Sequence, residues 1–197
     1  MRRICGSFLM CLLMLGSAYA KEDTNMKDTF SVIHSRKSVR SFTGAPVSKI
    51  DLDKIIRAGM AAPSAVNMQP WSFVVVTDRN KLDKLAAELP YAKMLYKAGA
   101  AIIVCTEAGK AYERSKDFAI IDASLAGENI LLAIEALGLG GVWTAVYPDT
   151  DRMNHVRAMF NIPHEVIPLN VIPVGVPTGV DKPKVKYKKG KIHWEQW

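Results

Sequence analysis

The chain has 197 residues, of which 49% are hydrophobic and 23% are charged, a composition that excludes a largely disordered chain and is ordinary for a globular protein. The length suggests one domain that is large enough to bury a core. The formal net charge is +7, but the basic residues gather at positions 36–40 and 182–191 and form no long stripe, which favours a compact anion over a nucleic acid as their ligand.

The first twenty residues have the organisation of a secretory signal peptide. Arginines at positions 2 and 3 precede an apolar run over 4–15, and the segment ends in the small-x-small pattern Ala18-Tyr19-Ala20. The apolar run is short for a membrane span, so an uncleaved N-terminal anchor is the alternative. We expect a signal peptide over 1–20 and a mature chain over 21–197 that is exported to the periplasm and leaves the membrane after cleavage.

Apolar periodicity and capping residues predict alternating helices and strands along the mature chain. Ser48 is placed to cap the second helix, and proline or glycine stops several others. In chain order we expect helices over 28–35, 46–63, 79–90, 91–100, 118–137 and 149–163, and strands over 71–77, 100–106, 142–147 and 166–176, the last broken by Pro168 and Pro173.

The helix expected over 118–137 is apolar almost all round, with Asp122, Glu128, Asn129 and Glu135 as the exceptions. Such a helix is buried, either in the core of one chain or in an interface between subunits. The strand over 100–106 has the continuous apolar pattern of a strand that is buried on both faces. Together the elements predict an α+β domain with a buried central helix.

Several common chemistries lack their sequence signatures. The glycines at 138, 140 and 141 follow a helix and precede a strand, the reverse of the order in a dinucleotide-binding turn, so we interpret them as a helix stop. No P-loop is present, the 4 histidines lie far apart without metal-ligand spacing, and Ser64 is not in a nucleophile elbow. Cys105 lies in an apolar strand and has no cysteine partner in the mature chain, which indicates a buried thiol.

The basic stretch "SRKSVRS" over 35–41 is the first candidate binding segment. Arg36, Ser38 and Arg40 are spaced two apart, so in an extended loop they project to one side. Two guanidinium groups around a hydroxyl form a clamp for a small dianion such as a phosphomonoester, and Lys37 adds charge. The alternative is a basic turn that faces solvent.

The second candidate segment is "APSAVNMQPW" over 62–71, which joins a helix to a buried strand. Pro63 and Pro70 bracket the loop and restrict its backbone. The amides of Asn67 and Gln69 both donate and accept hydrogen bonds, which suits the edge of a planar heterocycle. The alternative is a capping loop with Trp71 in the core.

Taken together, the motifs resemble those of the nitroreductase family of flavoproteins. The matching segments are "SRKSVRSF", "APSAVNMQPWSFVVV", "DASLAGENILLAIEALGLGGVW", "PVGVP" and "KPKVKYKKGKIHWEQW", and the resemblance extends from Phe30 to Trp197. It implies a nitroreductase-like α+β fold, in which helices flank a mixed sheet and a central helix is buried. It also implies a homodimer that holds FMN at the subunit interface, with the aromatic tail reaching across to the partner subunit.

The resemblance implies roles for two groups of basic residues at the phosphate end of FMN. Arg36 would hold the phosphate, and Lys184 and Lys186 would close on it. Arg40 would approach the ribityl chain or the N1/O2 side of the ring, and Lys37 and Ser38 belong to the same flavin-binding stretch. This chain has lysine at positions 37, 184 and 186. Family members commonly have arginine at these positions, and position 37 is also often histidine.

The resemblance places other residues around the flavin ring. Pro63, Ser64 and Ala65 would line the ring, partly across the subunit interface. Asn67 would hydrogen-bond the ring edge, with Gln69 nearby. A backbone N–H at Thr144 or Ala145 would reach flavin N5. Family members often have a glycine-containing pair at these two positions, so the hydroxyl of Thr144 offers a contact to N5 that those pairs lack. No catalytic side chain and no metal ligand is implied.

The implied activity is ping-pong oxidation and reduction in one open pocket. FMN takes a hydride from NADH, NADPH or another reductant and passes the electrons to a small-molecule acceptor such as a nitroaromatic, a quinone or a flavin. Export places the chain where NAD(P)H is scarce, which leaves the donor open. Two alternatives remain: a specialised branch of the family, dehalogenase-like or flavin-modifying, and a non-catalytic binding module for a phosphorylated ligand.

Overall fold

The computed structural model describes residues 28–197, so the signal peptide expected over 1–20 lies outside the described residues. The α-helices and strands of this part of the chain are α1 (Thr29–Ser35), α2 (Lys49–Met60), β1 (Trp71–Val76), α3 (Arg79–Glu88), β2 (Ala100–Glu107), α4 (Lys116–Ala136), β3 (Gly140–Gly141), β4 (Thr144–Ala145), α5 (Thr150–Phe160) and β5 (Val166–Gly175). Short 3₁₀ turns cover Ala65–Asn67, Lys93–Tyr96, Ala108–Lys110, Tyr112–Arg114 and Lys189–Lys191.

Side-chain caps fix the starts of most helices. Asp28, Ser48, Asp78 and Asp149 each accept a hydrogen bond from the backbone N–H three residues further on, at the beginning of α1, α2, α3 and α5. These bonds satisfy N–H groups that have no partner inside the helix. The helices predicted from capping and apolar spacing are therefore confirmed, except that the helix expected over 91–100 is only the 3₁₀ turn Lys93–Tyr96.

The strands form an antiparallel sheet in the order β1-β2-β5-β3, and β4 also pairs with β5. A parallel bridge between Ser38 and Gly141 extends the sheet beside β3. The α+β class is confirmed, but the named strands pair only antiparallel, so the expected mixed sheet is reduced to this one isolated parallel bridge among the described residues.

Two strand predictions need correction. The strand expected over 142–147 is reduced to β4, because Val142 and Trp143 lie outside the ladders that β3 and β4 form with β5. The ring of Trp143 instead packs against Gly127 of α4, where an added Cβ would lie 2.6 Å from the ring. The expected break in the last strand is also wrong, since β5 is continuous and a register shift beside Pro168 accommodates the missing N–H.

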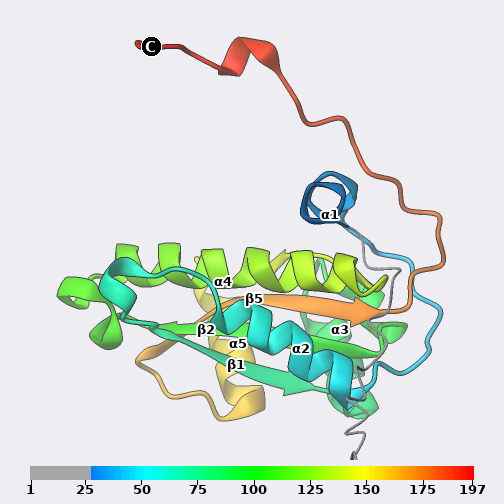
Figure 1. The fold of residues 1–197 in the computed structure, drawn as a ribbon. Helices are drawn as coiled ribbons and strands as arrows, with labels where there is room; N and C mark the ends of the chain where they lie inside the picture. Colours follow the sequence, from blue (N-terminus) through cyan, green and yellow to red (C-terminus); the bar gives the residue numbers. More distant parts are fainter. Residues whose placement is uncertain (1–27) are drawn as a thin grey trace, which may run out of the picture.

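Helices cover both faces of the sheet (Figure 1). Residues of α2 and α4 pack on one face, and residues of α3 and α5 pack on the other. The central strand β2 supplies both cores, with Ile102 and Val104 facing α2 and α4 while Ile103 and Cys105 face α3 and α5. The prediction that this strand is buried on both faces is confirmed.

The long helix α4 is buried along one side only within a single chain. Ile130 and Ile134 are inaccessible to solvent, whereas Phe118, Ile121 and Leu125 are exposed. The tail after β5 runs away from the body of the chain, as Figure 1 shows, and carries further exposed aromatic and apolar side chains at Val185, Tyr187, Ile192, Trp194 and Trp197. No helix in the described range 28–197 is long and apolar enough to cross a membrane.

Candidate functional site

A basic cavity of about 470 Å³ lies where the segment after α1 meets the tail after β5. It brings together six of the predicted flavin-binding residues with three others from the tail. Its lining consists of Arg36, Lys37, Ser38, Arg40, Val180, Asp181, Lys182, Lys184 and Lys186. The two basic clusters noted in the sequence therefore form one site in the folded chain, and they are not two independent solvent-facing turns.

Backbone pairing holds the first wall of this cavity against the sheet. The N–H of Val39 donates to the carbonyl of Gly141 at 3.0 Å, and the Val39 side chain is 1% exposed. Gly140 allows this approach, because an added Cβ would lie 2.6 Å from Val39 Cγ1. Burial of Val39 fixes the segment and leaves its basic neighbours on the side of the cavity.

Two of the basic side chains are held by carboxylates of α4. Arg36 Nε lies 3.1 Å from Glu128 Oε1, and Lys37 Nζ lies 3.2 Å from Oε2 of Glu135, which is 4% exposed. Ser35 donates its hydroxyl to the other oxygen of Glu135 at 2.9 Å. Glu128 and Glu135 both lie on α4, so this helix orients two of the cations that line the cavity.

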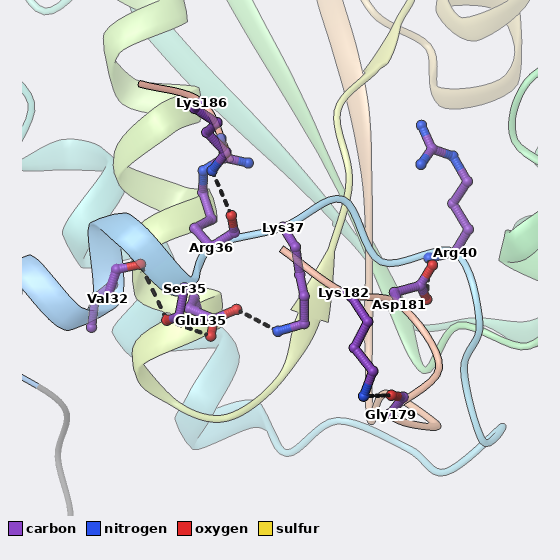
Figure 2. A network of polar contacts seen from close by, with 10 residues as sticks. All are labelled: Val32, Ser35, Arg36, Lys37, Arg40, Glu135, Gly179, Asp181, Lys182 and Lys186. Carbon is purple, nitrogen blue, oxygen red and sulfur yellow. Dashed lines mark hydrogen bonds and ion pairs between the residues drawn. The ribbon is translucent and has the colours of Figure 1, made fainter. Parts of the chain in front are cut away.

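The predicted clamp of two arginines is not formed. Figure 2 shows the Arg40 side chain pointing away from Arg36 and from the lysines of the cavity. The rule that residues two apart project to one side holds for a straight extended segment, but Arg36 is the C-cap of α1 and the chain bends there. Arg36 and Arg40 therefore serve different parts of the site.

The Arg40 side chain lines a second cavity of about 540 Å³. Aromatic and aliphatic groups dominate its lining, which consists of Arg40, Pro90, Tyr91, Lys93, Met94, Trp143, Thr144 and Ala145. Since Arg40 lines both cavities, a basic compartment and an aromatic compartment adjoin at this residue. The arrangement suits an elongated ligand with an anionic end and a planar end.

Sequence reasoning missed several residues of the aromatic cavity. Tyr91, Lys93 and Met94 come from the connection between α3 and β2, which we had interpreted as a short helix. That connection begins with Pro90 and leads into a buried strand. A proline-containing segment between a helix and a buried strand is also the pattern by which residues 62–71 were identified. This shared pattern is the signal that could have found them.

Thr144 does not offer the hydroxyl contact that its sequence position suggested. The side chain is 7% exposed, and its hydroxyl donates to the backbone carbonyl of Val171. Ala145 next to it is exposed on the cavity wall. A ligand therefore meets backbone groups and the Ala145 methyl at this place.

No residue of the loop 62–70 lines either cavity within one chain, and the loop lies far from the basic cavity. Its start is fixed by Asp122 of α4, whose Oδ1 accepts the N–H of Ala65 at 3.1 Å. Glu135, which borders the basic cavity through Lys37, lies on the same helix, and the rise from position 122 to position 135 is about 20 Å. Within one chain, the fold therefore does not bring the predicted ring-lining residues to the cavities. These residues are Pro63, Ser64, Ala65, Asn67 and Gln69.

The loop is nevertheless rigidly built. Val66, Asn67 and Gln69 have φ values of 42°, 60° and 51°, in the left-handed region that non-glycine residues seldom adopt. Gln69 donates from its backbone N–H to the Ser64 hydroxyl at 2.9 Å and from its side-chain amide to Asn67 Oδ1 at 2.9 Å. Such a loop is typical of one that presents its residues to a ligand or a partner.

The fold and the site define the class of the protein. The model of the nitroreductase family matches residues 33–89 and 85–176, so the chain belongs to this family of oxidoreductases. No group of three or more histidine, cysteine or acidic residues within the described range is placed to hold a metal ion.

Particular relatives agree with this membership. A candidate NADH dehydrogenase/NAD(P)H nitroreductase of Methanothermobacter thermautotrophicus is 41% identical over 170 residues, which cover 86% of this chain and 88% of that protein. The crystal structure of a candidate enzyme with the same description from Bacteroides thetaiotaomicron is 48% identical, with a TM-score of 0.81 over 87% of this chain and 99% of that one. The FMN reductase (NADPH) of Bacillus subtilis is 24% identical over 86% of this chain and 74% of its own length.

Proposed function

We propose that the protein is an FMN-dependent oxidoreductase that passes electrons from NADH, NADPH or another reductant to small acceptors such as nitroaromatics and quinones. The observation that carries this proposal is the meeting of a basic and an aromatic cavity at Arg40. FMN has a phosphate at one end and a planar ring at the other, so the donor set of the two cavities fits it. Family membership and the name of the Bacillus relative support the choice of flavin.

The residues of the chain divide the work of holding FMN. Arg36, Lys37, Lys184 and Lys186 supply positive charge for the phosphate, with Ser38 as a hydroxyl donor beside them. Arg40 stands at the junction and supplies positive charge near the ring, and Ala145 forms part of the wall there. When bound, FMN supplies the chemistry of accepting and donating a hydride. The protein supplies position and charge.

We propose that a second copy of the chain completes the ring end. The loop 63–69 and the basic cavity lie at opposite ends of α4, and the exposed apolar residues Phe118, Ile121 and Leu125 lie on the same helix. Pairing two α4 helices about a two-fold axis covers this apolar side and brings each loop toward the cavities of the other chain. The exposed aromatic tail is then available to pack on the partner subunit.

We also propose export with cleavage after Ala20, as the organisation of residues 1–20 suggests. The N-terminal sequence of the protein purified from the periplasmic fraction of its host tests this. Lys21 as the first residue supports the proposal, whereas an intact first segment in the membrane fraction supports an anchor.

The central experiment is a visible absorption spectrum of residues 21–197, recorded before and after anaerobic addition of NADH and then NADPH. We expect a yellow protein that either donor bleaches, and whose colour returns when a quinone is added. A yellow protein that only dithionite bleaches retains FMN and points to another reductant. A colourless protein that takes up no added FMN contradicts the proposal and favours a binding module for a different phosphorylated ligand.

A further inference from the structure

Residues Pro177–Lys186, which we call the lysine strap, lie across the segment that carries Arg36 and Arg40. The first part of the strap is fixed by backbone bonds: the N–H of Thr43 donates to the carbonyl of Val176, and the N–H of Thr178 donates to the carbonyl of Ser41, both at 3.0 Å. Regular pairing then ends, because Gly179 has a φ of +88° and turns the chain.

Beyond this turn, two side-chain contacts connect the strap to the other wall of the cavity. Asp181 Oδ2 accepts hydrogen bonds from the backbone N–H groups of Arg40 and Ser41, each at 3.1 Å. Lys186 Nζ donates to the carbonyl of Arg36 at 2.8 Å. Residues 182–186 are all exposed and belong to no helix or strand, so Asp181 is the half-buried fixed point from which the lysines extend (Figure 2).

We propose that Asp181 is a positioning residue that holds the lysine strap over the phosphate end of the site and so makes the site prefer a phosphorylated flavin to an unphosphorylated one. This inference rests on the proposed function, since it concerns how the same cavity retains FMN. It assigns a role to a carboxylate that no feature of the sequence had singled out.

A negative charge inside a basic cavity has two opposing effects. It repels a bound phosphate, and it also holds Lys182, Lys184 and Lys186 near that phosphate. The repulsion is weakened by solvent, because Asp181 is only half-buried. The two hydrogen bonds are charge-assisted and converge on one oxygen. Without them the backbone segment that carries the three lysines must be ordered each time a ligand binds. Positioning is therefore the larger effect.

The effect is confined to ligands that carry a phosphate. The lysines of the strap line the basic cavity and do not line the aromatic one. Riboflavin has the same ring as FMN but no phosphate, so it gains nothing from an ordered strap. The ratio of the Kd of riboflavin to the Kd of FMN then measures the contribution of the strap, whatever the ring end contributes.

The test compares the unchanged chain with Asp181→Ala, which removes the carboxylate, and Asp181→Asn, which keeps an acceptor oxygen but removes the charge. Asp151→Ala, an exposed position in the first turn of α5, is the control for loss of one negative charge. Dissociation rates and Kd are measured for FMN and riboflavin by flavin fluorescence at two salt concentrations.

We expect Asp181→Ala to release FMN about tenfold faster and to leave riboflavin binding unchanged, because the lost bonds hold only the phosphate end. We expect Asp181→Asn to stay within about threefold of the unchanged chain, since its amide oxygen still accepts both N–H groups. If both variants bind FMN more tightly, Asp181 acts as a competing anion and the inference is wrong. An unchanged Asp181→Ala also overturns it.

A second readout needs no flavin. Trypsin cleaves after Lys184 and Lys186, and we expect faster cleavage at these sites in flavin-free Asp181→Ala than in the unchanged chain or the Asp151→Ala control. Equal cleavage rates contradict the proposal that Asp181 holds the lysine strap in place. If the unchanged chain binds neither FMN nor riboflavin, the proposed function fails, while the cleavage rates still decide whether Asp181 holds the strap.

Discussion

The ammonium group of Lys37 lies 3.2 Å from the carboxylate of Glu135, although the two residues are far apart in the sequence. Glu135 is 4% exposed at the C-terminal end of α4, and Lys37 lines the basic cavity. A buried carboxylate in this position keeps Lys37 oriented before any ligand arrives. The pair therefore joins the hydrophobic core to the binding surface.

Replacing Glu135 by Ala should lower the free energy of unfolding by about 2 kcal/mol, because the change leaves the half-buried Lys37 side chain without its carboxylate. Glu128→Ala is the control, since Glu128 is exposed and its pairing with Arg36 contributes less than about 1 kcal/mol. Urea unfolding of the flavin-free protein measures both. Equal losses for the two variants would show that the burial of Glu135 has no energetic consequence.

Mixed dimers should reveal a site that is shared between chains. Arg36→Glu disables the phosphate end and Ala65→Trp blocks the loop, so each homodimer should lose most of its flavin. A dimer of one chain with each change has one site with both defects and one with neither, and should hold about half of the normal flavin. Flavin absorbance of doubly tagged dimers measures this.

The matched control for this experiment pairs an unchanged chain with a chain that carries both changes. Every shared site then has one defect, so such dimers should be nearly empty. The opposite pattern, with the control dimer half filled and the first dimer empty, would mean that each site is built within one chain.

We expect Asp122 to position the loop at the ring end of the site, as we propose that Asp181 positions the lysine strap at the phosphate end. Its side chain is 2% exposed and accepts the N–H of Ala65, while its second oxygen has no hydrogen-bond partner among the described residues. Asp122→Ala should weaken the binding of FMN and the binding of riboflavin by the same factor, about tenfold, because both ligands have the same ring. Flavin fluorescence titration measures the two values. Weaker binding of FMN alone would show that Asp122 acts at the phosphate end of the site and not at the ring end.

Cys105 should remain unreactive in the folded protein, because burial raises the pKa of its thiol from 9.0 to about 12. In the unfolded chain the thiol ionises near its ordinary pKa, so between pH 9 and pH 12 the folded state binds more protons than the unfolded state. Stability should therefore fall with rising pH in this window, by up to about 1.4 kcal/mol per pH unit from this residue.

Cys105→Ala should remove that part of the pH dependence while leaving the contribution of other groups. Urea unfolding of both proteins between pH 8 and pH 11 measures the difference in slope, and a thiol reagent such as DTNB at pH 8 tests reactivity directly. Identical slopes, or rapid labelling of the folded chain, would contradict the burial of this thiol.

The helices and the central strand could be predicted because their signals are local. Ser48 caps α2, and the alternating contacts of β2 follow from its continuous apolar run. The strand expected over 142–147 was misjudged because Trp143 packs on Gly127, a contact between different elements that no local pattern reveals. The same limit applies to the site. The sequence indicated Arg36 and Lys184 but not Asp181, whose partners are the backbone N–H groups of Arg40 and Ser41.

The separation of the loop and the basic cavity along α4 has a consequence for how the protein behaves on dilution. On the proposed arrangement, neither chain alone encloses the cofactor, so dissociation of the dimer and release of FMN are one linked equilibrium. Added flavin then strengthens the association of the subunits, and the melting temperature rises with both flavin and protein concentration. A cell that makes little of the protein would keep much of it empty, whatever the intrinsic affinity of each site.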